Sequence, residues 1–224
     1  MHGTVPPMPY ERSQFHGGLE RREMLPFVPL SARSVLDVGC SHGLFGSVLR
    51  SHHPGWELTG IEPDPDAATD ARRHYRTVIN GLYPDDMPGD RRFDCIIFND
   101  VLEHVVDPWS MLRRTGDLLE DGGTVVASIP NVRYVIVVRN LLLRGRWDYA
   151  DWGVLDRTHL RFFTRASIEE LFASCGFEIE SMTPINPVKV RWADLLVGRF
   201  RDMRFQQFAV VARAARPRAA SGRS

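Results

Sequence analysis

The stretch over residues 34–46 constrains the fold of this chain more than any other. It reads Ser-Val-Leu-Asp-Val-Gly-Cys-Ser-His-Gly-Leu-Phe-Gly. The apolar, β-branched start predicts a buried strand over 35–38, and the later spacing predicts an amphipathic helix over 44–52. The bare backbone at Gly39 and Gly43 lets a ligand approach the main chain. A helix N-terminus offers free N–H groups and a positive dipole end. The stretch therefore predicts a nucleotide-type ligand.

Strands and helices alternate along most of the chain. This rhythm predicts an α/β fold with a doubly wound, mostly parallel sheet. In such a sheet, ligands bind beyond the carboxyl ends of the strands. We expect strands at 35–38, 58–61, 77–79, 93–98, 124–129, 177–182 and 205–212, and helices at 19–27, 44–52, 64–75, 108–119 and 166–175.

The bulk composition sets the domain organisation and excludes several classes of function. The 224 residues suit one domain: an N-terminal loop and helix (1–30), a main domain (31–212) with insertions at 131–165 and 184–204, and a flexible tail (213–224). Lys plus Arg equals Asp plus Glu, 28 each, so no bulk charge favours nucleic acid. Three cysteines show neither a disulfide framework nor a zinc spacing, so we expect no metal and a reducing, cytoplasmic setting. No apolar run reaches a membrane span.

An acidic residue follows the second expected strand, in Gly-Ile-Glu-Pro-Asp at 60–64. A carboxylate there can accept hydrogen bonds from ribose hydroxyls. Glu62 follows Gly39 by about the 20 residues that separate a glycine turn from its ribose-binding acid. The alternative is a carboxylate at a helix N-terminus, which describes Asp64 well. Glu62 comes too early for that role, so we predict that it binds a ribose.

A third polar group follows the fourth expected strand. Asn99, Asp100 and Val101 should emerge beside the glycine turn, since this strand neighbours the first one. Asn99 or Asp100 could instead cap a helix, and both roles can coexist. His104 is expected to pack beneath the site.

At this point the chain resembles the class I S-adenosylmethionine-dependent methyltransferases. The resemblance covers about residues 20–183. It is carried by Val-Leu-Asp-Val-Gly-Cys at 35–40, Gly-Ile-Glu at 60–62, Asp-Val-Leu-Glu-His at 100–104 and the segment 119–123. Ser-Ile-Pro-Asn-Val-Arg at 128–133 and Leu-Asp-Arg-Thr-His-Leu-Arg-Phe-Phe-Thr at 155–164 resemble a broad bacterial branch, many of whose members accompany polysaccharide or natural-product pathways.

The resemblance implies a Rossmann-like, seven-stranded sheet with an antiparallel last strand and a helical insertion after strand five. It also implies S-adenosylmethionine as cofactor. The glycine turn would line its methionine part and Glu62 its ribose. Ser41 replaces a usual glycine, and Leu82 stands where many members have an acid for the adenine, so that contact would come from backbone, Asn80, Asp85 or Asp86. The implied cofactor residues are Gly39, Cys40, Ser41, Gly43, Glu62, Pro63, Gly81, Leu82, Asn99, Asp100 and Val101.

The first insertion carries the candidates for catalysis. A hydroxyl acceptor needs a base, and the imidazole of His159 titrates near neutral pH. Asp156, three residues earlier, could orient it if the segment is helical. The alternative is a buried polar latch that ties the insertion to the sheet through Asp156, Arg157, His159 and Arg161.

The apolar run at 134–143 is flanked by arginines. It can form a lid, a homodimer contact or a helix at a membrane interface. The leading hypothesis for function is methyl transfer to an O or N atom of a small molecule, such as a sugar or natural-product intermediate. The alternatives are a quinone or lipid methyltransferase at the membrane surface and a non-catalytic cofactor-binding scaffold. An NAD oxidoreductase is disfavoured because Ser41 breaks the dinucleotide pattern.

Overall fold

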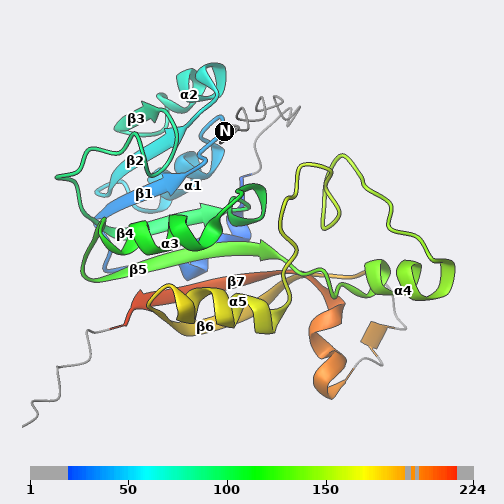
Figure 1. Cartoon of the computed structure of the whole chain (residues 1–224). Coiled ribbons are helices and arrows are strands. Elements are labelled where there is room, and N and C mark those ends of the chain that lie inside the picture. The colour runs from blue at the N-terminus through cyan, green and yellow to red at the C-terminus, as the bar shows by residue number, and fades with distance from the viewer. Residues whose placement is uncertain (1–19, 190–192, 195–196, 216–224) are drawn as a thin grey trace, which may run out of the picture.

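A computed structural model describes residues 20–189, 193–194 and 197–215. Its single sheet has seven strands in the order β3-β2-β1-β4-β5-β7-β6 (Figure 1). All neighbours pair in parallel except β7, which runs antiparallel to both β5 and β6. The predicted sheet with one antiparallel last strand is therefore confirmed. The strands are β1 (Ser34–Val38), β2 (Glu57–Glu62), β3 (Thr77–Asn80), β4 (Phe93–Asn99), β5 (Leu119–Pro130), β6 (Phe177–Pro187) and β7 (Phe205–Ala214).

Helices cover both faces of this sheet, because alternate strand residues point to opposite sides. Leu36 and Val38 pack in the core under α3 and α5, whereas Val35 packs in the core under η1 and α1. The central strands are accordingly buried and apolar, as parallel strands are. The helices are η1 (Arg22–Phe27), α1 (Leu44–His52), α2 (Pro65–Ala71), η2 (Leu102–His104), α3 (Pro108–Gly116), α4 (Val135–Arg144), α5 (Arg165–Ser174) and η4 (Gly198–Arg204).

Side-chain caps set the starts of two helices, and one of them is the Asp64 cap that the sequence indicated. The Asp64 carboxylate accepts hydrogen bonds from the N–H groups of Asp66 and Ala67 and begins α2. Thr164 and Ser167 form a reciprocal capping box at the start of α5. Asp64 is therefore the carboxylate that caps the N-terminus of α2, and Glu62 does not have that role.

Several predicted boundaries are wrong for local reasons. The helix expected to run to residue 75 ends at Ala71, since tight turns redirect the chain so that Tyr75 enters the core. The helix expected over 108–119 ends at Gly116, and β5 begins at Leu119 and includes Gly122 and Gly123. The first helical segment is a 3-10 helix that contains Pro26, and residue 19 lies outside the described residues.

The second insertion is shorter than expected, and the last strand extends into the expected tail. β6 continues to Pro187, so only the residues after it leave the sheet. β7 includes Arg213 and Ala214, and the rest of the expected tail beyond 215 lies outside the described residues. The first insertion carries α4, which Figure 1 shows beyond the arrowhead of β5, away from the sheet. In the part of the chain that the structure describes, no helix has the length and apolarity needed to cross a membrane.

Candidate functional site

The glycine turn after β1 is a tight, left-handed connection. Gly39 and Ser41 have φ of 68° and 48°, and Gly43, at 84°, begins α1. The N–H groups of Gly39 and Cys40 both donate to the Ile61 carbonyl, at 2.9 and 3.3 Å. A Cβ on Gly39 would lie 3.0 Å from Val101 Cγ2, and one on Gly43 would lie 2.8 Å from Ala71 Cα. The glycines thus permit the turn and the close approach of α1 to α2.

Glu62 ends β2 directly beside this turn. Its Oε2 accepts a hydrogen bond from the Ser41 N–H at 2.9 Å, and its Oε1 accepts one from the Asp64 N–H at 3.0 Å. The side chain is buried, and burial raises its pKa. A carboxylate offers about four lone-pair sites, so two remain for hydroxyl donors. The carboxylate therefore has both the location and the capacity to bind a ribose.

Two of the predicted cofactor residues, Cys40 and Pro63, have main-chain atoms that they can offer to a cofactor. The Cys40 side chain is buried in the core, where a Cβ on Gly60 would lie 2.6 Å from its Sγ, and burial raises the thiol pKa. The Pro63 carbonyl accepts a hydrogen bond from Asn80 Nδ2 at 3.0 Å. Cys40 can therefore face a cofactor only through its backbone.

The residues after β4 lie opposite the glycine turn, because Val38 pairs with Phe98 in the sheet. Both polar atoms of the Asn99 side chain are buried and have no hydrogen-bond partner among the described residues. Buried amides without partners are rare and call for an explanation. A polar ligand at the carboxyl ends of β1 and β4 would supply the missing partner.

Asp100, in contrast, is committed to the protein. Its Oδ2 lies 2.7 Å from Arg21 Nη1, and its Oδ1 accepts hydrogen bonds from Ser128 Oγ (2.9 Å) and Gln207 Nε2 (2.7 Å). This network ties β4, β5 and β7 to the chain before η1. The sequence alone did not suggest Arg21, Ser128 or Gln207, since single polar residues far apart in the chain carry no local pattern.

The segment after β3 contains Leu82, which stands where the resemblance implied an acidic residue that binds the adenine. Leu82 is 58% exposed, and its N–H donates to Asp86 Oδ2 at 2.7 Å. The Asn80 amide donates to the carbonyls of Glu62 and Pro63, and Asp85 pairs with Arg114. A Cβ on Gly81 would lie 2.6 Å from Asp86 Oδ2. The three side chains that could replace the adenine-binding acid, those of Asn80, Asp85 and Asp86, thus already have partners within the protein. Leu82 presents an apolar surface.

His159 is buried near the end of the first insertion. Its Nδ1 lies 3.1 Å from the Val154 carbonyl, which can only accept, so Nδ1 carries the hydrogen and Nε2 holds the lone pair. Burial, followed by the nearby His104, lowers its pKa, so the ring is neutral at pH 7. The Asp156 side chain does not hold this ring. Its Oδ1 accepts from the N–H and Oγ1 of Thr158, at 2.8 and 2.6 Å.

His159 and His104 lie edge to face, with ring centroids 4.7 Å apart, above the fully buried Glu103. Burial also lowers the pKa of His104 and raises that of Glu103 well above its usual range. The Glu103 carbonyl accepts hydrogen bonds from the N–H groups of Leu160 and Arg161, which fastens the insertion to the end of β4. A latch is therefore present. It consists of these main-chain bonds at Glu103 and of the predicted Arg161 guanidinium, which donates to the Val106 carbonyl, whereas Asp156 and Arg157 pair within the insertion.

These residues fit S-adenosylmethionine. The turn at Gly39 leaves no room for a side chain beneath Val101, Glu62 has two lone-pair sites to spare, and Asn99 has an unpartnered amide. Gly39, Ser41, Glu62 and Asn99 would hold the cofactor, with Leu82 against its base. When bound, the cofactor supplies an electrophilic methyl group and a good leaving group.

Comparisons with known proteins agree with this geometry. A family model described as a methyltransferase domain matches residues 15–182. The chain is 26% identical over 199 residues to a ubiquinone biosynthesis O-methyltransferase of Azorhizobium caulinodans, covering 79% of this chain and 71% of the relative. It is 30% identical over 173 residues to the Thiobacillus denitrificans protein of that name, covering 69% of this chain and 68% of the relative.

The fold matches solved structures as well. The plantazolicin methyltransferase in complex with S-adenosylhomocysteine (SAH) superposes with a TM-score of 0.61 at 14% identity, over 87% of this chain and 80% of that one. The match to the family model spans most of the chain, from the segment before η1 into the first half of β6. The chain belongs to the class I S-adenosylmethionine-dependent methyltransferases and is an enzyme of that family.

Proposed function

We propose that this enzyme transfers a methyl group to a hydroxyl oxygen of a small acceptor with an extended apolar part, of the quinone or lipid class. One observation carries the choice of acceptor: the helix α4 presents exposed leucines beside arginines at the sheet end where the cofactor residues gather. The two relatives named above support it, since both are named ubiquinone biosynthesis O-methyltransferases.

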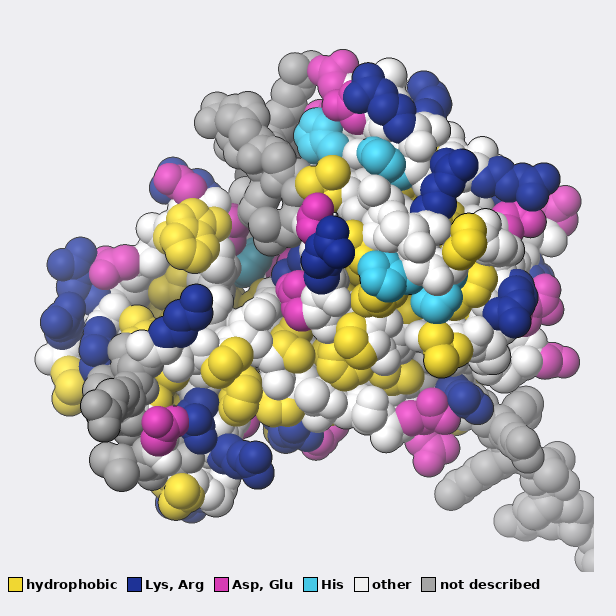
Figure 2. Space-filling model, turned by 180° about the vertical axis from the view of Figure 1, so that it is seen from behind, with side chains coloured by type: hydrophobic (Ala, Val, Ile, Leu, Met, Phe, Trp, Pro, Cys, Tyr) yellow, Lys and Arg dark blue, Asp and Glu magenta, His cyan; other side chains and the backbone are white. Residues whose placement is uncertain are grey.

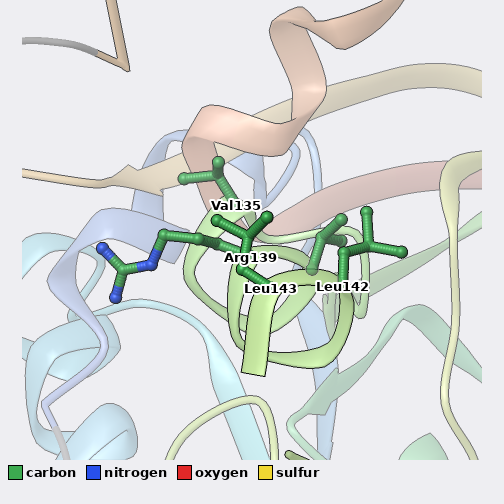
Figure 3. A pocket seen from close by; sticks show the side chains of 5 residues that line it. Val135, Arg139, Leu142 and Leu143 are labelled. Atoms are coloured by element: carbon green, nitrogen blue, oxygen red, sulfur yellow. The ribbon is translucent and has the colours of Figure 1, made fainter. Parts of the chain in front are cut away.

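The apolar surface of α4 is the structural basis of this proposal. Leu141, Leu142 and Leu143 are 44%, 75% and 78% exposed. An open groove of about 480 Å³ is lined by Val135, Val138, Arg139, Leu142 and Leu143 (Figure 3). In Figure 2 the lobe that contains α4 lies at the left and shows arginines interspersed with hydrophobic side chains. Leucines flanked by arginines suit the interface of an anionic membrane.

Oxygen methylation requires that the acceptor hydroxyl lose its proton as the new bond forms. The neutral imidazole of His159, with Nδ1 held by Val154, presents Nε2 as the proton acceptor. The Val154 carbonyl holds the His159 ring, whereas Asp156 acts on the neighbouring His104 ring through Thr158 Oγ1, which lies 3.1 Å from His104 Nδ1. We propose His159 as the base and Asp156 as the residue that shapes the 156–159 turn.

The acceptor is tested by comparing matched compounds. Purified enzyme with S-adenosylmethionine should methylate a dihydroxylated aromatic ring that carries a prenyl chain, detected by mass spectrometry and by SAH release. The same ring without the chain should react several-fold more slowly at equal concentration, because the apolar contacts are lost. Equal rates for both compounds would contradict an apolar acceptor while leaving the methyl transfer intact.

Vesicle binding tests α4 separately. The wild-type chain should co-sediment with vesicles that contain phosphatidylglycerol, and the double variant Leu142→Ser, Leu143→Ser should bind several-fold less. Leu30→Ser, which removes an equally exposed leucine (76%) ahead of β1, is the control and should bind like wild type. If the wild type stays in the supernatant and forms dimers that the double variant lacks, α4 is a dimer contact instead.

A sugar or natural-product acceptor is the second candidate. Tyr149 and Trp152, which follow α4, are 57% and 74% exposed, and exposed aromatic rings suit sugar or planar acceptors. Trp152→Ala should then lower turnover of a hydroxylated sugar nucleotide in the same assay. Failure of every acceptor despite firm SAH binding would favour the non-catalytic scaffold.

A further inference from the structure

Three side chains from two distant segments converge above the end of β4. Glu103 and His104 belong to η2, and His159 comes from the first insertion. One potential ligand atom of each lies within 4.8 Å of the other two. Hydrogen bonds from Leu160 and Arg161 to the Glu103 carbonyl, at 2.8 and 3.0 Å, hold the two segments together. The grouping is therefore built into the fold.

The burial of the Glu103 carboxyl group is not explained by any hydrogen bond among the described residues. Its side chain is 0% exposed, and neither carboxyl oxygen has a hydrogen-bond partner among the described residues. The nearest cationic candidate, His159 Nε2, lies 3.9 Å from Oε1, beyond hydrogen-bond range. Leaving a buried carboxyl group unsatisfied costs about 1–3 kcal/mol or more. A ligand that binds both the carboxylate and the rings would remove this cost.

Both histidines are oriented to act as ligands through Nε2. His159 Nδ1–H donates to the Val154 carbonyl at 3.1 Å, and His104 Nδ1–H faces both the Thr158 carbonyl (3.3 Å) and Thr158 Oγ1 (3.1 Å), which accept. Histidines that bind metals characteristically donate their other ring N–H to a carbonyl or carboxylate, which fixes the tautomer and the ring plane. Thr158 is itself held by Asp156 Oδ1, so Asp156 supports the cluster from outside.

We propose that Glu103, His104 and His159 bind one divalent transition-metal ion. Two imidazoles and one carboxylate suit Zn²⁺, Co²⁺, Fe²⁺ or Mn²⁺ better than Ca²⁺ or Mg²⁺, which prefer oxygen ligands. Three protein ligands leave positions open for another molecule. The sequence shows no such site because β5 and most of the insertion separate His104 from His159, with no local spacing to recognise.

The place of this site connects it with the reaction. Val101, one residue before η2, packs over the glycine turn. An ion bound at the cluster would therefore be held by the segment that directly follows this contact with the glycine turn, and a bound metal lowers the pKa of a hydroxyl that it ligates. This consequence rests on the proposed function, and with it His159 would act as a ligand rather than as a base. The binding of the ion itself does not depend on the acceptor.

Direct titration tests the site. The full chain, stripped with EDTA and dialysed, is titrated with Co²⁺ and followed by visible absorption and calorimetry. We expect one ion per chain, d–d absorption typical of mixed nitrogen and oxygen ligands, and a rise in Tm with Co²⁺ concentration. Competition with Zn²⁺ should abolish the absorption. Absence of both the absorption and the Tm shift at millimolar Co²⁺ would overturn the proposal and leave Glu103 as a buried neutral acid.

Variants locate the ion. Glu103→Gln keeps the size of the side chain and should weaken Co²⁺ binding at least about tenfold, as should His159→Gln. His52→Gln, which removes an exposed histidine at the end of α1, is the control and should bind like wild type. Each variant is first checked for SAH binding, which reports the fold independently of the acceptor. Wild-type affinity in Glu103→Gln would contradict the site even if methyl transfer is observed.

Discussion

Replacing Glu62 by Gln is expected to weaken SAH binding by about 5- to 150-fold, or about 1–3 kcal/mol, because charge-assisted hydrogen bonds to the ribose hydroxyls are lost. Calorimetric titration measures the change. Glu57→Gln, at the exposed start of the same strand, is the matched control and should bind SAH with unchanged affinity.

Glu62 also holds the turn through the Ser41 and Asp64 N–H groups, so the variant could act indirectly. An analogue of SAH that lacks the 2′-hydroxyl separates the two effects. It should bind the wild type less well than SAH does, whereas Glu62→Gln should bind both ligands almost equally. If the variant discriminates between them as strongly as the wild type, Glu62 supports the turn and does not bind the ribose.

Replacing Asp37 by Asn is expected to change how stability depends on pH. Asp37 is fully buried in β1, beneath the glycine turn, and burial raises its pKa to about 7. The Tyr75 hydroxyl donates a hydrogen bond to it, which opposes the shift. The nearby Glu62 charge raises the pKa further.

The sign follows from proton binding in the two states. Between about pH 4 and 7 the folded chain keeps the Asp37 proton and the unfolded chain loses it, so the free energy of unfolding falls as pH rises through this window. Above it the loss is complete and amounts to about 4 kcal/mol, an order-of-magnitude figure. Asn cannot ionise and still accepts the Tyr75 hydrogen bond, so Asp37→Asn should gain stability relative to wild type between pH 5 and pH 8.

Urea unfolding at pH 5, 6, 7 and 8 measures this difference. Because Glu62, Glu103 and Tyr75 are present in both proteins, the difference between them isolates Asp37. Asp90→Asn, on the exposed turn before β4, serves as the control. Parallel stability curves for wild type and Asp37→Asn would show that the carboxyl group is ionised in the folded protein, contrary to expectation.

The cofactor half of the site is local in the sequence, which is why it could be predicted. The turn at 39–43 and the acid at Glu62 each follow a buried strand, and parallel strands place their carboxyl ends at one sheet edge. The pairing of Val38 with both Ile61 and Phe98 confirms that neighbourhood. The helix expected over 108–119 ends earlier, at Gly116, because β5 already begins at Leu119.

The residues around the acceptor could not be predicted in the same way. Asp156 looked like a partner for His159 by spacing, yet the segment is not helical and the Val154 carbonyl holds the ring. Asp100 looked available for a ligand, yet Arg21 and Gln207 occupy it. Contacts across such separations follow from how the chain closes on itself, and no residue pattern encodes them locally.

The sequence by itself determined the α/β class, the glycine turn and the acid that follows it, because these depend on hydrophobic period and on backbone freedom at single positions. The antiparallel last strand was implied by the resemblance to the methyltransferase family. Only the tertiary structure decided that Glu103, His104 and His159 meet and that α4 carries its leucines away from the core. The physical reason is that burial and side-chain convergence are properties of packed surfaces. They arise only when the insertion after β5 is fastened onto the end of β4.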